Sequence, residues 1–331
     1  MTPLQPAEIA GIVTETARLT RELYVFPEVG GKLADLLADR LAEGRYDGAA
    51  DPQTLGRLVT EDLQSVSQDR HLRLKFHHEE VPATENGAVL AELHREADLS
   101  LGGVPLVERL GGGVARLKLA PIVFPLGLVG AEPLTAGFNL VAPAEALILD
   151  LRECVGGHPE AVAHVSAYLL DEPTHLTTLY DREDGSYRQL WSPAHVPGPR
   201  FGGEKPLYVL ISAATFSGGE ALAYDLQQQG RAVVVGERSG GGANPRQGFT
   251  LHPQLEATIP VSRSINPVSG TNWEGVGITP DIETDPADAL DVAHRAALAA
   301  VAARDTDTPS AAEARRLLAG AAEPARDGEP I

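Results

Sequence analysis

The spacing of apolar residues changes early in the chain from a helical period to a strand period, and this change limits the folds that the chain can adopt. Three segments before the change carry apolar residues at helical spacing, at residues 9–24, 29–41 and 55–66. The third is preceded by Asp51, a typical N-cap residue, with a proline next to it. Three amphipathic helices with short links predict a helical bundle over residues 1–68.

The residues that follow alternate between polar and apolar side chains, as in a strand with one buried face. His71, Arg73 and Lys75 fall on one face, which predicts that His71 leads a polar strand face. Further on, strand-like and helix-like segments alternate up to an alanine-rich helix over 285–303, which is typical of the α/β class. We expect a domain over residues 69–303.

The last part of the chain differs in composition. Beyond Asp305 it holds mainly Pro, Ala, Glu and Arg, apart from a short helical pattern over 311–318. Segments with few large apolar residues cannot bury enough surface to offset the entropy of ordering. We expect a weakly ordered tail over residues 304–331.

Composition excludes several classes of partner and site. The chain has 331 residues, of which 43% are hydrophobic, so it can bury a sizeable core. Its net charge of -19 argues against binding to nucleic acid or anionic lipid, because both require clustered Lys and Arg. The single cysteine, Cys154, excludes an internal disulfide and a Cys-rich metal site.

Neither the histidines nor the glycines predict a metal or a cofactor. His77 and His78 are adjacent, so they point to opposite faces of a strand, and no further spaced histidine completes a ligand set. The glycine-rich loop over 238–248 lacks the lysine of a phosphate loop and the spacing of a dinucleotide turn. We expect no metal and no cofactor.

The sequence also predicts a location. No apolar run approaches the roughly 18 residues that span a bilayer. Residues 1–18 lack the basic start and apolar block of a signal peptide. We expect a cytoplasmic protein without a membrane span.

One segment places a serine where a strand becomes a helix. An apolar run over 206–211 precedes Ser217, and a helical pattern that ends near Gly230 follows it. The N–H groups of the first helical turn are unpaired, so those of Gly218 and Gly219 can donate to a developing oxyanion.

A structural role explains the same serine. Ser217 and Glu220 have the spacing of a capping box, in which the serine only begins the helix. Thr215 also stands where the Gly-x-Ser-x-Gly turn of other hydrolases needs glycine. This segment alone therefore leaves capping and catalysis open.

Five motifs together resemble one peptidase family. They are Asp69-Arg70-His71-Leu72, Asp150-Leu151-Arg152 before Gly156-Gly157, Thr215-Phe216-Ser217-Gly218-Gly219-Glu220, Gly236-Glu237, and Asn272-Trp273-Glu274-Gly275-Val276-Gly277-Ile278-Thr279-Pro280-Asp281. Their order is similar to that of the tail-specific, or C-terminal processing, peptidases (family S41), in the tricorn-like and interphotoreceptor-retinoid-binding-protein-like branch. The resemblance implies a ClpP/crotonase-like core of ββα units after a three-helix bundle. It also implies a serine peptidase that cleaves extended or unfolded polypeptides.

The resemblance assigns three catalytic roles. It implies Ser217 as nucleophile, His71 as general base and Glu274 as the carboxylate that orients the base. A serine hydroxyl needs such a base because it is a weak nucleophile at neutral pH. The processing peptidases use a lysine instead, but residues 240–243 contain none. The histidine-based site is therefore the one available.

The resemblance also implies an oxyanion hole made of backbone amides. The donors would be the N–H of Gly218 and the N–H of Gly156 or Gly157, because glycines let a carbonyl approach the backbone closely. Arg70 departs from the family, which usually has a small residue there. Its side chain would either crowd the site or bind a substrate carboxylate.

A second class of function lies within the same family. One branch resembles a carrier, so the alternative is a catalytically degenerate module that binds retinoid or fatty acid. Aromatic residues make up only 5% of the chain, which gives little support for a ring-lined pocket. Retention of all three catalytic residue types favours the peptidase.

Overall fold

The computed structural model describes residues 3–78, 80, 87–304 and 307–322. The chain forms two compact units, each assembled from segments that are distant in sequence. The first unit lies within Met1–Arg95, Thr177–Leu190 and Gly241–Val276. The second lies within Glu96–Leu176, Trp191–Gly240 and Gly277–Ile331.

Three helices begin the first unit, as predicted: α1 (Pro6–Leu23), α2 (Pro27–Ala42) and α3 (Pro52–Ser67). Each begins with proline, whose fixed φ and missing N–H suit the first helical turn. Asp51 caps α3 by accepting the N–H of Thr54 at 2.9 Å. The sequence signals for these helices are thus local and strong.

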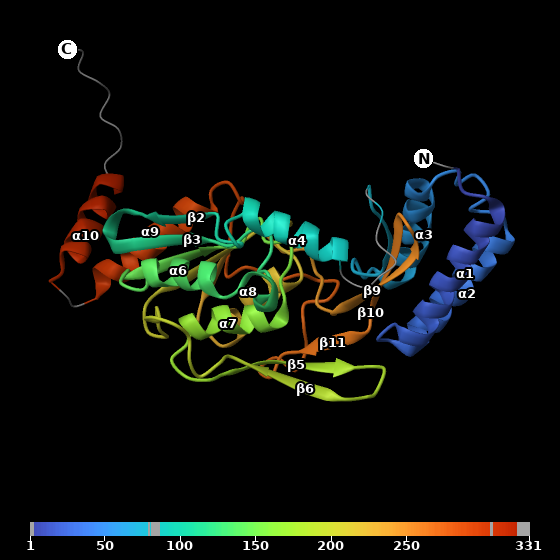
Figure 1. Ribbon diagram of the computed structural model, residues 1–331. Coiled ribbons are helices and arrows are strands. Elements are labelled where there is room, and N and C mark those ends of the chain that lie inside the picture. Colours follow the sequence, from blue (N-terminus) through green and yellow to red (C-terminus); the bar gives the residue numbers. More distant parts are fainter. Residues whose placement is uncertain (1–2, 79, 81–86, 305–306, 323–331) are drawn as a thin grey trace, which may run out of the picture. The chain divides into compact units, whose positions relative to one another are not determined.

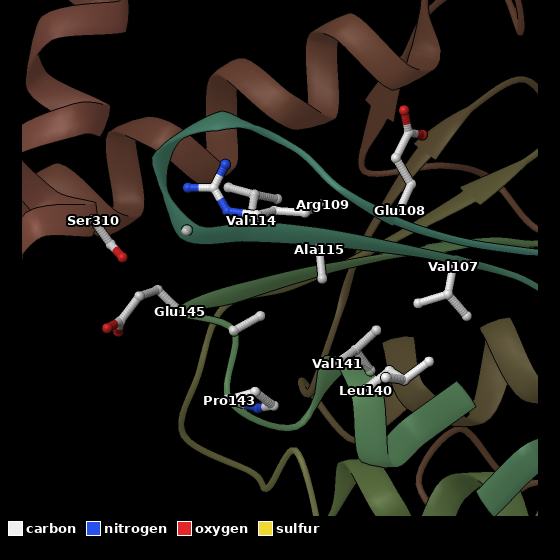
Figure 2. A pocket seen from close by; sticks show the side chains of 12 residues that line it. Val107, Glu108, Arg109, Val114, Ala115, Leu140, Val141, Pro143, Glu145 and Ser310 are labelled. Atoms are coloured by element: carbon white, nitrogen blue, oxygen red, sulfur yellow. The ribbon is translucent and has the colours of Figure 1, made fainter. Parts of the chain in front are cut away.

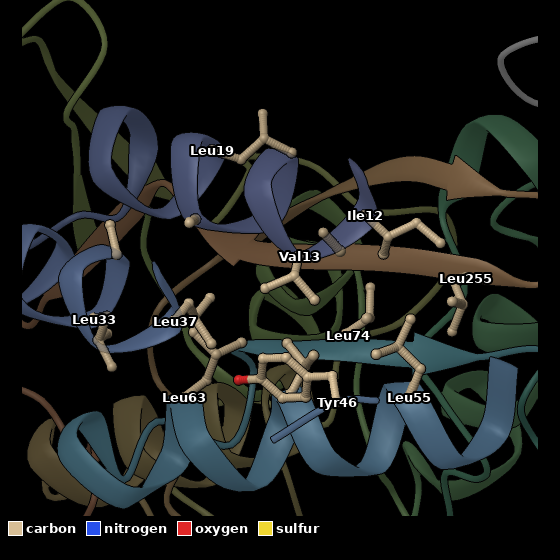
Figure 3. Close-up of a cluster of buried hydrophobic side chains, with 14 of the residues drawn as sticks. Ile12, Val13, Leu19, Leu33, Leu37, Tyr46, Leu55, Leu63, Leu74 and Leu255 are labelled. Atoms are coloured by element: carbon tan, nitrogen blue, oxygen red, sulfur yellow. The ribbon is translucent and has the colours of Figure 1, made fainter. Parts of the chain in front are cut away.

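The helices of the first unit pack on a small antiparallel sheet. The sheet has the order β1 (Arg73–Phe76), β10 (Leu255–Pro260), β9 (Arg246–His252). Apolar side chains from α1, α2 and α3 meet Leu74 and Leu255 from the sheet in one core (Figure 3). This core fixes one face of the sheet, so the alternate residues of the strands lie on its other face.

A second three-stranded sheet has the order β11 (Ser262–Ile265), β5 (His175–Asp181), β6 (Tyr187–Trp191). β11 pairs with β5 in antiparallel register, with Ser262 opposite Asp181. The hydroxyl of Ser262 donates to the Asp181 carboxylate at 2.9 Å. β11 follows β10 almost directly, so one stretch of chain contributes to both sheets.

A six-stranded sheet forms the centre of the second unit. Its order is β12 (Ile282–Glu283), β8 (Val233–Gly236), β7 (Leu207–Ile211), β4 (Ala146–Asp150), β3 (Val114–Lys118), β2 (Leu106–Arg109). All neighbours pair in parallel except the edge strand β2. β4 and β7 are buried throughout and read as continuous apolar runs, as parallel strands covered on both faces do.

Helices accompany this sheet (Figure 1). They are α5 (Leu126–Val129), α6 (Glu132–Val141), α7 (Pro159–Leu169), α8 (Gly218–Gln228), α9 (Ala289–Ala303) and α10 (Pro309–Ala322), with a short 3-10 turn over Gly111–Gly113. A further helix, α4 (Gly87–Leu99), contains the boundary between the first and second units. Small residues of α9, such as Ala293 and Ala297, pack on the sheet in one buried cluster. Small side chains let a helix approach a sheet closely, which explains the alanine-rich sequence.

Two segments differ from the sequence expectation. α10 is longer than the predicted short helix, and Ala311 and Ala314 are fully buried, with Ala314 in the cluster that includes α9. Small apolar residues at helical spacing are enough to hold α10 in place because α9 lies close to them in the same cluster. His71 lies in a turn before β1 rather than on a polar strand face, and only 4% of it is exposed.

The predicted α/β class with leading helices is confirmed by this architecture. The predicted domain boundaries stay a prediction, because the two units are each assembled from three separated stretches of chain. Among the described residues, none of the helices combines the length and apolar character needed to cross a membrane.

Candidate active site

A tightly bonded turn carries Ser217 between β7 and α8. Thr215 is fully buried, and its hydroxyl donates to the carbonyl of Leu151 while accepting the N–H of Ser212, each at 2.9 Å. The N–H of Phe216 donates to the carbonyl of Cys154 at 3.0 Å. These hydrogen bonds join the turn to the loop that follows β4, and they fix the backbone that leads into Ser217.

The backbone of Ser217 has a conformation that serine rarely adopts. Its φ is 51° and its ψ is -119°. A non-glycine residue in such a region costs about 1–3 kcal/mol and persists only where its surroundings impose it. An ordinary N-cap does not need this strain, since Asp51 caps α3 at φ -138° and ψ 157°. Capping alone therefore does not explain the turn.

The capping box that the sequence predicted is nevertheless present. The N–H of Ser217 donates to Glu220 Oε2 at 2.9 Å, and Glu220 is fully buried. Glu220 Oε1 accepts the hydroxyl of Ser239 at 2.5 Å, and Ser239 Oγ accepts the N–H of Ile278 at 2.7 Å. The capping box does not exclude a catalytic role for Ser217. Glu220 accepts the backbone N–H of Ser217, and this bond does not use the hydroxyl proton.

Two glycines next to Ser217 form a narrow backbone contact. A Cβ atom on Gly218 would lie 2.4 Å from the nitrogen of Gly157, so only glycine fits at 218 without moving the loop. Neither amide nitrogen, of Gly157 or of Gly218, donates a hydrogen bond to any residue that the structure describes. The N-terminal dipole of α8 favours negative charge at this point. The two N–H groups are suited to an oxyanion.

Gly156 has a different role from its neighbour. Its carbonyl accepts the N–H of Val123 at 3.1 Å, and a Cβ atom there would meet only Ile122, at 3.6 Å. Of the two glycines that the sequence offered as the second donor, Gly157 is the one in close contact with Gly218.

The other predicted catalytic residues gather in the first unit. Asp69, His71 and Glu274 each have one nitrogen or oxygen atom within 4.8 Å of the others. Asp69 is almost fully buried, and it accepts the backbone N–H of His71 at 2.9 Å and the Tyr24 hydroxyl at 3.2 Å. Two carboxylates therefore lie close to one imidazole.

Backbone amides hold Glu274 in place. Glu274 Oε2 accepts the N–H of Ala243 at 2.6 Å and that of Asn244 at 3.1 Å. The N–H of Glu274 donates to the side chain of Asn272 at 3.0 Å. Two successive amides of the glycine-rich loop thus bind this carboxylate.

Sequence reasoning missed Asp69 as a site residue, although the motif contains it. The signal was available: an aspartate two residues before a histidine can accept that residue's N–H in a local turn. Among the described residues, possible metal-ligand atoms of Asp69, His71 and Glu274 lie close enough together to hold one cation.

Burial controls the charge of this group. Burial, together with the smaller effect of the positive charges of Arg246, Arg73 and Arg70, lowers the pKa of His71 to about 3. Burial raises the pKa of Asp69, against the hydrogen bonds that the carboxylate accepts. The imidazole is therefore neutral at neutral pH, which is the state that a general base requires.

The predicted site residues belong to two units. Ser217, Gly218, Gly156 and Gly157 lie in the second unit. His71 and Glu274 lie in the first. The pairing of Ser217 with His71 stays a prediction, whereas the local geometry around each is as given above.

One pocket lies apart from all these residues. It has a volume of about 440 Å³ and lies in the second unit beside β2 and the end of α6 (Figure 2). Val107, Leu140 and Val141 contribute apolar lining, and Arg109 and Glu145 contribute charge. None of the predicted catalytic residues lines it.

Comparison with known proteins identifies the family. The model of peptidase family S41 matches residues 134–284, and the model of the N-terminal domain of peptidase S41 in eukaryotic IRBP matches residues 6–98. The chain belongs to peptidase family S41. The S41 match includes Ser217, Gly157 and Glu274, and the N-terminal match includes His71.

Two relatives found by sequence comparison are processing peptidases. The chain is 29% identical over 140 residues to the chloroplastic C-terminal processing peptidase of Tetradesmus obliquus, and 30% identical over 139 residues to carboxyl-terminal-processing peptidase 3 of Arabidopsis thaliana. Each match covers 42% of this chain, but only 29% and 26% of those proteins. The chain thus matches less than a third of their length.

Several solved structures share the fold. Mature CPAF has a TM-score of 0.63 at 11% identity, covering 91% of this chain and 99% of that one. The photosystem II D1 C-terminal processing protease has a TM-score of 0.53 at 15% identity, covering 85% and 94%. The tricorn protease has a TM-score of 0.55 at 12% identity, covering 87% of this chain and 35% of that one. At such identities the likeness concerns the fold.

Proposed function

We propose that this S41 chain is a serine peptidase in which Ser217 is the nucleophile. The observation that carries the proposal is the strained backbone of Ser217 beside the narrow contact of Gly218 with Gly157. Backbone strain of this kind persists only where the surrounding structure imposes it, and it clusters at active sites and ligand-binding sites.

The reaction that we propose follows from these groups. His71, neutral at neutral pH, takes the proton of the Ser217 hydroxyl as the oxygen attacks a peptide carbonyl. The negative oxygen that forms accepts the N–H groups of Gly157 and Gly218. His71 then gives its proton to the leaving amine. In the second step water attacks the acyl group, His71 takes a proton from that water, and Ser217 leaves with the proton that His71 returns.

Carboxylates next to the imidazole serve the charged intermediate. Glu274 and Asp69 each have an oxygen atom within 4.8 Å of a ring nitrogen of His71, and at that distance their charges stabilise the imidazolium that forms for a moment. The proposal therefore adds Asp69 to Glu274 as a supporting carboxylate. Extended or unfolded polypeptide is the substrate that we propose, and the names of the relatives, which are processing peptidases, support a polypeptide substrate.

Active-site labelling tests this function. A serine-directed phosphonate should add one mass increment to the wild-type chain, and a fluorogenic peptide library should be cleaved. Ser217→Ala should lose both properties. Ser166→Ala is the matched control, because Ser166 is a buried serine on α7 whose hydroxyl donates to the carbonyl of Val162 within the same helix. Equal cleavage by Ser217→Ala and wild type would refute the assignment.

The carrier alternative has a different signature. A carrier has no use for a strained serine beside the close contact of Gly218 with Gly157, so the backbone geometry at Ser217 favours the peptidase. Native mass spectrometry of the purified chain separates the two: stoichiometric lipid without turnover would favour the carrier.

A further inference from the structure

Three side chains with metal-binding atoms meet inside the first unit. Asp69, His71 and Glu274 each contribute one possible ligand atom, and these atoms lie within 4.8 Å of one another. Asp69 and His71 are almost fully buried, and all three residues belong to the first unit. Because Glu274 is far from the other two in the sequence, no spacing of ligands along the chain reveals the group.

A fourth side chain, that of Asn244, lies beside this group and is fully buried. The backbone N–H of Asn244 donates to Glu274 Oε2 at 3.1 Å, and its side-chain amide lies beside the Asp69 carboxylate. Asn244 Oδ1 accepts no hydrogen bond from a residue that the structure describes. A buried carbonyl oxygen without a donor is unfavourable, and a cation that binds it removes that cost.

Hydrogen bonds already hold the ligand residues in place. Asp69 accepts the backbone N–H of His71 at 2.9 Å and the hydroxyl of Tyr24 at 3.2 Å. Glu274 accepts two successive backbone amides, and the carbonyl of His71 accepts the hydroxyl of Thr258 at 2.5 Å. Side chains that are held in this way lose little conformational entropy when an ion binds.

The kinds of donor atom favour one type of cation. An imidazole nitrogen with carboxylate oxygens is a typical ligand set of Zn²⁺, whereas Ca²⁺ and Mg²⁺ prefer oxygen ligands alone. Ligand atoms around tetrahedral Zn²⁺ lie about 3.4 Å apart, so shifts of about 1 Å bring the three atoms of this group to that spacing. Two carboxylates balance the charge of the ion, which a buried cation requires.

Positive charges around the group limit the affinity. The charges of Arg246, Arg73 and Arg70 reach the imidazole of His71, and they oppose a cation there. Structural zinc sites made of thiolates and imidazoles bind far more tightly. We therefore expect a micromolar rather than a nanomolar Kd for Zn²⁺.

We propose that Asp69, His71 and Glu274, together with Asn244, bind one Zn²⁺ ion, and that this ion inhibits the enzyme reversibly. A neutral imidazole has one nitrogen lone pair, because its other nitrogen carries the ring proton. Whichever nitrogen binds Zn²⁺, the ring then has no lone pair left to accept a proton from serine. The metal-free chain is therefore the active form. The inhibition rests on the proposed peptidase function and describes its regulation.

Zinc binding to the full-length Ser217→Ala chain tests the site without turnover. Isothermal titration calorimetry in metal-free buffer should show one Zn²⁺ ion bound per chain with a micromolar Kd. Mg²⁺ at the same concentrations should show no binding, because it prefers six oxygen ligands. The absence of Zn²⁺ binding, or Mg²⁺ binding of equal affinity, would overturn the proposal.

Substitutions in this chain show whether the proposed ligands bind the ion. Asp69→Asn and Glu274→Gln each remove one negative charge with little change in size, and each should weaken Zn²⁺ binding about 100-fold, since loss of a ligand costs at least as much as loss of a group that orients one. His77→Gln is the matched control and should bind like its parent, because His77 Nε2 lies 3.0 Å from Glu256 in an imidazole–carboxylate pair outside the site.

The variants differ in how much they disturb the core. If Asp69→Asn does not fold, Glu274→Gln decides, because Glu274 is only partly buried. Zn²⁺ binding at the parent affinity in the folded ligand variants, or its loss in His77→Gln, would overturn the proposed site.

The zinc site and the peptidase fail separately. One Zn²⁺ ion per chain, together with a wild-type chain that cleaves no peptide, would support the zinc site and refute the peptidase. For a wild-type chain that cleaves, free Zn²⁺ at ten times its Kd should lower kcat/KM about tenfold, and a chelator should restore it. Cleavage that this concentration of Zn²⁺ leaves unchanged would support the peptidase and refute the inhibitory ion.

Discussion

Replacing Ser217 with glycine should stabilise the chain while removing the proposed chemistry. The φ of 51° and ψ of -119° at Ser217 penalise any side chain with a Cβ atom by about 1–3 kcal/mol. Glycine has no such penalty, but its greater freedom in the unfolded chain reduces the gain by about 0.4–1 kcal/mol. Relative to Ser217→Ala, the net gain in the free energy of unfolding is about 0.5–2 kcal/mol.

Comparing Ser217→Gly with Ser217→Ala isolates the strain, because both variants lack the hydroxyl. Thermal unfolding should give Ser217→Gly the higher Tm, by about 1–4 °C for a chain of this size. Ser166 provides the control pair. It lies within α7, so Ser166→Gly should be less stable than Ser166→Ala by about 1 kcal/mol.

The sign of the difference in Tm between Ser217→Gly and Ser217→Ala shows whether the backbone at Ser217 is strained. If the backbone at Ser217 is strained, Ser217→Gly has a higher Tm than Ser217→Ala. At the control position the order is reversed, so Ser166→Gly has a lower Tm than Ser166→Ala. If Ser217→Gly has a Tm at or below that of Ser217→Ala while the Ser166 pair behaves as expected, the backbone at Ser217 is not strained and the proposed function loses its main support.

Three further predictions concern the oxyanion hole, the base and the last helix. Gly218→Ala would bring its Cβ to 2.4 Å from the nitrogen of Gly157, so peptide cleavage should fall about 100-fold or more, whereas Gly127→Ala, which meets no atom within 4 Å, should cleave like wild type; equal kcat for both variants would contradict the oxyanion hole. The pKa of His71 is about 3 in the folded chain and about 6.5 in the unfolded chain, so between these pH values only the unfolded chain binds a proton at this imidazole. The free energy of unfolding should therefore decrease as the pH is lowered from about 6.5 toward 3. Between pH 7 and 5, denaturant titrations should show wild type losing about 2 kcal/mol more than His71→Gln, and parallel curves would refute the buried neutral imidazole. Ala314→Asp buries a charge in α10 and should lower the free energy of unfolding by about 3 kcal/mol or more; a change below about 0.5 kcal/mol would show that α10 is not packed.

Much of the fold follows from local signals in the sequence. The prolines that begin α1, α2 and α3 and the Asp51 cap mark helices without reference to the rest of the chain. The apolar runs at β4 and β7 mark parallel strands that are covered on both faces. α10 was underestimated because the alanines that it buries have little intrinsic hydrophobicity, and their burial depends on the surface that they meet.

The site was harder to derive from the sequence. Ser217 was ambiguous because its spacing to Glu220 fits a capping box, and only the backbone angles distinguish a strained turn from an ordinary cap. Asp69 is only partly derivable from the sequence: its bond to the N–H of His71 is a local turn, but its contact with Tyr24 depends on the folded unit. Gly157 could not be separated from Gly156 without the close approach of Gly218.

Labelling of three variants tests the central claim most directly. The claim is that Ser217 becomes a nucleophile because His71 removes its proton. Intact-mass measurement after reaction with a serine-directed phosphonate should show one adduct on wild type, mapped by peptide mass to Ser217, and no adduct on Ser217→Ala. His71→Gln should react at least 100-fold more slowly. Labelling of His71→Gln at the wild-type rate, or an adduct that persists in Ser217→Ala, would contradict the account.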